Sequence, residues 1–228
     1  MPHKNFERTK NTTLMYAILM VFICIAYFLY NKISTRTNIN RTIDDMAWMA
    51  QKITDDTPNH NYSELDIDVA VLAEYIPFDL NIKEKGDGYT VKNRFGGEMH
   101  IYGAVADKDE QVAYLSLNKN QRLHDRGIVG GSAYIISLSG LNRRVCRVLA
   151  QTDWKARIPN FLGLEATNVT KPYYTPLTLN FEILKDNRGI KRKTEEGGIA
   201  SHFSLTKEEA REACGCFWHS CSIALKFL

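Results

Sequence analysis

The chain has 228 residues and a formal net charge of +3, from 29 Lys and Arg against 26 Asp and Glu. No long run of one sign occurs, so nothing in the charge balance requires nucleic acid, and none is expected as a partner. About 200 residues follow the apolar segment described next, which is enough for one domain with its own core.

A continuous apolar run near the N-terminus is the most informative segment of the sequence. It covers residues 14–30 (LMYAILMVFICIAYFLY). At 1.5 Å rise per residue it spans about 26 Å, close to the roughly 30 Å of a bilayer's hydrocarbon core. Lys4, Arg8 and Lys10 precede it as in a secretory signal peptide, but the run is long for one and no small-residue cleavage site follows. A membrane anchor is therefore predicted.

The orientation of this anchor is indicated by cysteine rather than by charge. The basic residues before the run are matched in number by Lys32, Arg36 and Arg41 after it, so the positive-inside count is a tie. Cys24 lies in the run, and an even number of cysteines lies beyond it, which fits disulfides in an oxidising compartment. These four are Cys146, Cys214, Cys216 and Cys221. Residues after Asn31 are predicted to be extracytoplasmic.

A helical pattern continues directly from the apolar run. Apolar side chains recur at helical spacing over residues 33–53, and no Gly or Pro interrupts residues 11–57. Pro58 disfavours helical angles in the residue before it, so the helix is predicted over about 13–55. The expected organisation is a leader-like segment 1–12, a helical segment 13–57 with membrane-spanning part 13–30, and a globular domain 58–228. The alternative is a membrane helix, a short linker and a separate surface helix.

Strand patterns dominate the sequence beyond Pro58. Residues 63–75 read as a short helix or an irregular segment, and strands are predicted at 89–95, 98–105, 111–117 and 133–137. A helix is predicted at 141–154, a strand at 177–184 with a turn at 186–189, and a short helix at 206–213 that opens with a capping box. Alternating residues 223–227 predict a last strand. The fold class is α+β, with the long N-terminal helix packed on an antiparallel sheet and a disulfide-tied C-terminal region.

Several motifs occur in an order that resembles the type IVb pilin family. The helix is followed by Ile76-Pro77 and then by VKNRFGGEMHI at 91–101, which is similar to the family pattern I-x-N-x-[WF]-G-G-x-[VM]-x-[VI]. Ser139-Gly140-Leu141 to Cys146 resembles the helix with the first disulfide cysteine, and residues 210–227 resemble the segment with the second. The resemblance covers most of the chain, with an extra stretch around 171–198.

The N-terminal processing region departs from the family pattern. Pilin precursors resembling this chain have Gly before the cleaved bond and Glu a few residues after it. Here Asn11 and Tyr16 stand at those places around Thr12 and Thr13, and the first glycine in the sequence is Gly86. The resemblance therefore favours a specialised minor subunit, or a pilin-like protein that stays in the membrane, over a standard major pilin.

The resemblance implies a structural subunit of a type IV pilus or related filament. Such a subunit is held in the bacterial inner membrane with its C-terminal domain extracytoplasmic, and is packed by its helix into a cell-surface filament. Its partners would be other pilin subunits, membrane lipid and the pilus assembly machinery. The expected filament-core residues are Leu14, Ile18, Val21, Phe22, Ile25, Phe28 and Leu29.

No enzymatic function and no cofactor are expected. The sequence has no nucleophile elbow, phosphate loop or H-E-x-x-H pattern, and Asp66 and Asp68 are more simply surface carboxylates than cation ligands. The alternative function is a membrane-anchored extracytoplasmic binding module or adhesin-like tip component. The aromatic segment 171–176 (KPYYTP) is a candidate for binding in that case.

The resemblance implies a disulfide between Cys146 and Cys214, with a possible second pair of Cys216 and Cys221. Pairing of Cys146 with Cys216 remains open, because four cysteines allow three connectivities. A bridge that closes a loop of about seventy residues stabilises the fold by about 4 kcal/mol. A zinc site is the alternative use of Cys214, Cys216, His219 and Cys221, with His202 nearby, although the spacings are tight for tetrahedral closure.

Overall fold

The structure is a computed structural model of the chain that divides into two compact units, residues 1–40 and 41–228. It describes residues 3–59, 61–86, 88–104, 133–168, 182–186, 189–193, 198–201, 203–217 and 221–228. Side chains are described from residue 15 on, except those of residues 182–193. The predicted strand at 111–117 and the segment 171–176 lie outside the described residues.

One long helix, α1, runs from His3 to Asp56. It is ten residues longer at its N-terminal end than the sequence pattern predicted, because the basic and polar residues before the apolar run continue the helix. It stops ahead of Pro58, where the backbone N–H of Thr57 donates to the carbonyl of Thr54 at 3.2 Å. The predicted continuous helix is therefore confirmed, and the alternative with a linker is wrong.

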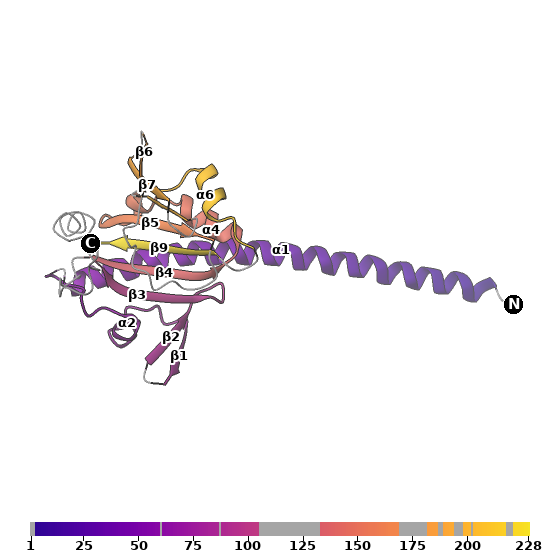
Figure 1. Ribbon diagram of the computed structural model, residues 1–228. Helices are drawn as coiled ribbons and strands as arrows, with labels where there is room; N and C mark the ends of the chain where they lie inside the picture. The colour runs from indigo at the N-terminus through magenta and orange to yellow at the C-terminus, as the bar shows by residue number, and fades with distance from the viewer. Residues whose placement is uncertain are drawn as a thin grey trace. The chain divides into compact units, whose positions relative to one another are not determined.

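The described strands of the second unit form one antiparallel sheet of nine strands, in the order β1-β2-β3-β4-β9-β5-β8-β7-β6 (Figure 1). The strands are β1 (Asn81–Lys85), β2 (Gly88–Lys92), β3 (Glu98–Ala104), β4 (Ala133–Leu141), β5 (Phe161–Thr167), β6 (Glu182–Asp186), β7 (Gly189–Lys193), β8 (Ile199–Ser201) and β9 (Cys221–Phe227). The last strand lies between β4 and β5, so segments far apart in the sequence meet at the centre of the sheet. The α+β class is confirmed.

Short helices surround this sheet: α2 (Ile67–Leu72), α4 (Arg143–Gln151), α5 (Trp154–Arg157) and α6 (Lys207–Ala213). The helix predicted at 141–154 exists but is shorter, because Leu141 still belongs to β4 and α4 ends at Gln151, with α5 as a separate helix after it. Asn142 accepts from the N–H of Val145 at 2.9 Å to begin α4, and Asp153 accepts from the N–H of Ala156 at 3.1 Å to begin α5. The predicted capping box at Thr206 and Glu209 is confirmed.

Residues 41–56 of α1 pack on the sheet and complete the core of the second unit. Met46, Met49, Ala50 and Ile53 have no exposed surface. Tyr134 of β4 donates its hydroxyl hydrogen to the carbonyl of Ala50 at 2.8 Å, which fixes the helix against strand β4. The amphipathic half of the predicted helix therefore has its partner in the sheet.

The N-R-F-G-G motif is the turn between β2 and β3, and it packs on the end of β4. Asn93 is buried, accepts from the N–H of Phe95 at 2.9 Å and donates to the carbonyl of Ser139 at 2.8 Å. Gly96 has φ of +85°, which favours glycine. A Cβ added to Gly97 would overlap the Ser139 carbonyl. The motif and the Ser139-Gly140 segment thus meet at one backbone contact.

An ion-pair network joins this turn to the helix. Arg94 donates from Nε to Asp45 at 2.7 Å and from Nη2 to Asp79 at 2.9 Å. The Arg94 and Asp45 side chains are only 11% and 15% exposed. The hydrogen bonds to Asp45 and Asp79 raise the pKa of Arg94. The hydrogen bond from the Arg94 guanidinium lowers the pKa of the Asp79 carboxyl.

Gly97→Ala is expected to destabilise the protein by about 2 kcal/mol, because the added methyl group must displace the Ser139 backbone. Gly88→Ala is the control, since its nearest neighbours are the carboxylate atoms of a movable Asp68 side chain, and its loss should stay below about 1 kcal/mol. Urea unfolding of the full chain in detergent, followed by tryptophan fluorescence, measures both. Equal losses would contradict the packing role of Gly97.

Arg94→Ala is expected to cost about 3 kcal/mol, because it leaves the mostly buried Asp45 carboxylate without its partner. Arg157→Ala is a matched control. Arg157 of α5 lies 3.9 Å from Asp44 of α1, but the two side chains are 52% and 76% exposed. Its loss should stay within about 0.5 kcal/mol. The same unfolding measurement decides, and a comparable loss in both variants would exclude the network as an anchor of the helix.

Candidate functional site

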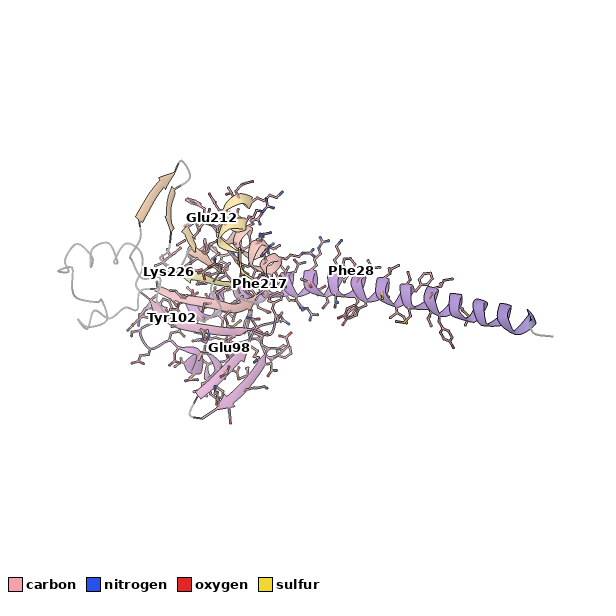
Figure 2. All side chains as sticks on the ribbon, turned by 45° about the vertical axis from the view of Figure 1, so that its right-hand side comes forward. Phe28, Glu98, Tyr102, Glu212, Phe217 and Lys226 are labelled. Carbon is pink, nitrogen blue, oxygen red and sulfur yellow. A yellow bond between two sulfur atoms is a disulfide. The ribbon has the colours of Figure 1, made fainter. Side chains whose placement is uncertain are left out.

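The apolar stretch of α1 is the first candidate site. Every residue from Met15 to Ile33 is exposed, with Phe22 at 65% and Phe28 at 68%. Figure 2 shows the Phe28 side chain projecting from the helix. Within the described residues, this helix is long and apolar enough to cross a membrane by length and composition. Large exposed apolar surfaces of this kind mark membrane or protein contacts.

The predicted filament-core residues recur every three or four positions from Leu14 to Leu29, so they share one face of this stretch. Ile18, Val21, Ile25 and Leu29 are between 49% and 57% exposed. In the processing region, Tyr16 is 62% exposed. The backbone of Asn11, Thr12, Thr13 and Leu14 is helical, and their side chains lie outside the described ones. A helix that is apolar all round is suited to lipid or to neighbours on every side.

The second candidate site is the disulfide-tied cap formed by α4, α6 and the start of β9. Cys146 of α4 is bonded to Cys214 at the C-cap of α6, with Cα atoms 5.8 Å apart. Cys216 is bonded to Cys221 at the start of β9, with Cα atoms 5.4 Å apart. All four cysteines are buried. This is the connectivity that the sequence resemblance favoured over pairing of Cys146 with Cys216.

Arginines surround this cap. Arg143 donates from Nε and Nη2 to the carbonyl of Cys216, at 3.2 and 3.0 Å. Arg147 follows Cys146 directly, and loss of hydration together with the nearby charges of Arg143 and Arg211 lowers its pKa. The sequence does not indicate the proximity of these arginines to Cys216 and Arg211, because that proximity depends on long-range packing.

The carboxylates considered as cation ligands bind backbone groups instead. Asp66 accepts from the N–H of Val69 at 2.8 Å and caps α2. Asp68 accepts from the N–H of Tyr89 at 2.6 Å. His202 and His219, the histidines of the zinc alternative, lie outside the described residues. The two aspartates therefore have a structural use.

The second unit also exposes large apolar side chains that the sequence pattern did not single out. Phe78 is 98% exposed and Leu72 is 71% exposed. Phe217, which follows Cys216 and is labelled in Figure 2, is 77% exposed. No periodic pattern in the sequence around these three residues distinguishes them from buried apolar residues. Exposed aromatic side chains on a folded unit are typical of contact surfaces.

Comparison with protein-family models and with curated proteins finds no match. Among solved structures, the chain is similar to the crystal structure of a type IV b pilin from Salmonella typhi. The TM-score is 0.46 and the sequence identity 9%, over 80% of this chain and 95% of that chain.

Removing the long-range bridge with Cys146→Ser and Cys214→Ser is expected to cost about 4 kcal/mol, since the bonded residues are 68 positions apart. Removing the local bridge with Cys216→Ser and Cys221→Ser should cost about 2 kcal/mol, since its residues are only 5 positions apart. Non-reducing peptide mapping verifies the pairing and urea unfolding gives the losses. A free Cys146 thiol in the wild-type map would refute the pairing.

Proposed function

We propose that the chain is a pilin-like structural subunit, held in a membrane by the first part of α1 before it joins a filament. The observation that carries this proposal is the fully exposed apolar stretch Met15–Tyr30, which belongs to the same helix whose residues 41–56 complete the sheet unit. An apolar stretch exposed on all sides has to be covered by lipid, by other copies of the helix, or first by lipid and then by other copies.

Two environments suit the same stretch. In a bilayer, the apolar side chains face lipid and the helix satisfies its own backbone hydrogen bonds. In a filament, the stretches of several subunits pack against one another and exclude water, so that the exchange of lipid for protein neighbours needs no chemical step. The role is non-enzymatic on this proposal. The partners are other subunits, membrane lipid and an assembly machinery that extracts the helix.

The described part of the second unit supports this role because it holds the C-terminal part of α1 firmly in the sheet unit. The Arg94 network and the Tyr134 hydrogen bond hold residues 45–54 of the helix in the sheet unit. The cap with its two disulfides lies against β9 and β5, in the middle of the strand order. Exposed Phe78 and Phe217 are the side chains on this unit that neighbouring subunits would cover.

Val21→Arg combined with Ile25→Arg is expected to abolish membrane retention, because each arginine near the centre of a span costs about 3 kcal/mol on insertion. The two positions lie one helical turn apart within the exposed apolar stretch. The full chain is expressed in a bacterial host, membranes are washed with alkaline carbonate, and the chain is detected in pellet and supernatant. Wild type should stay in the pellet.

Thr37→Arg combined with Asn40→Arg is the matched control, since both residues are exposed on α1 beyond the apolar stretch. This variant should remain in the pellet. Immunogold labelling of sheared filaments then tests assembly: label along the shaft supports a structural subunit, whereas label only at the tip or in the membrane supports the anchored binding module. Extraction of the wild type by carbonate would refute the anchor.

A further inference from the structure

The two disulfides of the cap lie next to each other. The Sγ atoms of Cys146, Cys214 and Cys221 are all within 4.8 Å of one another, and all three residues are buried. Cys146 is bonded to Cys214, whereas Cys221 is bonded to Cys216. The sulfur of Cys221 therefore lies within 4.8 Å of both sulfurs of the other bridge. Since a disulfide bond is about 2 Å long, Cys221 has to approach either sulfur by less than about 3 Å to bond to it.

Sulfurs at this separation are placed for thiol–disulfide exchange. In that reaction a thiolate attacks one sulfur of a disulfide, forms a new bond with it and expels the other sulfur as a thiolate. Cys216 is not a member of the group of mutually close sulfurs. Cys216 is therefore the sulfur that leaves when Cys146 or Cys214 attacks Cys221.

The surroundings of Cys216 suit a leaving group. Arg143 donates to the Cys216 carbonyl at 3.0 Å and brings a positive charge to this residue, which favours a thiolate. The Sγ atom of Cys216 lies 3.9 Å from the carbonyl oxygen of Leu141. That oxygen is an acceptor for the S–H group once the expelled sulfur is protonated.

The two bridges also differ in how easily they form from thiols. The local bridge joins residues 5 positions apart and the long-range bridge joins residues 68 positions apart, so the local bridge closes at a smaller entropic cost. Cys216 is flanked by the exposed Gly215 and Phe217, whereas Cys146 lies in α4 and has no exposed surface. An oxidant from solvent therefore reaches Cys216 more readily than Cys146.

We propose that the Cys216–Cys221 pair passes its disulfide to Cys146 and Cys214 through a mixed disulfide of Cys221. The local pair is then an internal oxidant that makes the bond between α4 and the end of α6. Because the exchange takes place within the cap, no second protein has to reach the buried Cys146. Filament assembly enters no step, so the proposal stands or fails separately from the proposed function.

Each step of this relay balances. In the first step, the thiolate of Cys146 attacks Cys221, the bond between these two sulfurs forms, and Cys216 leaves as a thiolate. In the second step, the thiolate of Cys214 attacks Cys146, and Cys221 leaves as a thiolate. The protons lost by the two attacking thiols are taken up by the two leaving thiolates, and the chain neither gains nor loses electrons. A small external disulfide then oxidises the local pair again, takes up two electrons and two protons, and becomes two thiols. A relay in which Cys214 attacks first balances in the same way.

The first test compares two variants that keep the Cys146–Cys214 bond and differ in the thiol that is left free. Both also carry Cys24→Ser, because Cys24 is an exposed free thiol. Cys216→Ser leaves a thiol at Cys221, inside the close group, and Cys221→Ser leaves one at Cys216, outside it. Each purified full chain is kept in detergent without oxygen at about pH 8.5, where roughly half of ordinary thiols are ionised. Samples are blocked with a maleimide in urea at about pH 6, where exchange is slow, and non-reducing peptide mapping locates the blocked cysteine.

In Cys216→Ser the maleimide label is expected to spread with time from Cys221 to Cys146 and Cys214. The rate should rise about tenfold per pH unit between about pH 6 and 8, because the thiolate is the attacking species. In Cys221→Ser the label is expected to stay on Cys216. A label that stays on Cys221, in a chain with native far-ultraviolet circular dichroism, would overturn the proposal. Equal spreading in both variants would also overturn it.

The second test traps the mixed disulfide with Cys214→Ser, which removes the last partner of the relay. In the folded chain, Cys146 is expected to be bonded to Cys221 about tenfold more often than to Cys216, because only Cys221 is held close to it. In urea the two bonds should form in similar amounts, since the loops that they close are similar in length. Similar amounts in the folded chain would contradict the relay.

The third test follows the order of bond formation when the reduced chain is oxidised by a small disulfide. The Cys216–Cys221 bond is expected to appear before the Cys146–Cys214 bond. Cys216→Ser combined with Cys221→Ser should slow formation of the long-range bond by about tenfold, because the internal oxidant is lost. An unchanged rate in this double variant would show that the long-range bond forms without the relay.

Discussion

Burial of residues 41–56 of α1 on the sheet is the interaction on which the second unit depends. Met46, Met49, Ala50 and Ile53 have no contact with water, and together they supply the layer that an antiparallel sheet needs on its apolar face. Directional contacts fix the helix within this layer, through Tyr134 to the Ala50 carbonyl and through Arg94 to Asp45. One continuous helix therefore meets two opposite requirements, since its first apolar part is exposed and its last part is core.

The N-R-F-G-G motif has a physical explanation that does not involve binding. Asn93 supplies hydrogen bonds that a tight turn and the adjacent Ser139 carbonyl both need, and Gly96 and Gly97 occupy positions where a side chain would be strained or would overlap backbone. These residues therefore stabilise the packing of the β2–β3 turn on the end of β4. Likeness in this motif consequently reports on fold, whereas function has to be argued from the exposed helix and the cap.

Local features were predictable from the sequence, and long-range ones were not. The absence of Gly and Pro defined α1, alternation defined β9, and Thr206 with Glu209 defined the start of α6. Strand β1 was missed because all five of its residues are exposed, which leaves no burial period to detect. The Arg94 network and the proximity of Cys146 to Cys221 join positions remote in sequence, and no local pattern encodes such a meeting.

The position of β9 at the centre of the sheet affects how the chain folds. Leu138 of β4 pairs with Ile223 of β9 across nearly half of the second unit's sequence, and closing such a long loop is entropically costly and slow. The Cys146–Cys214 bond joins points a short distance along the chain from each of these partners. Once this bond has formed, the central strand pairing closes only a short loop, and the entropic cost of that pairing falls.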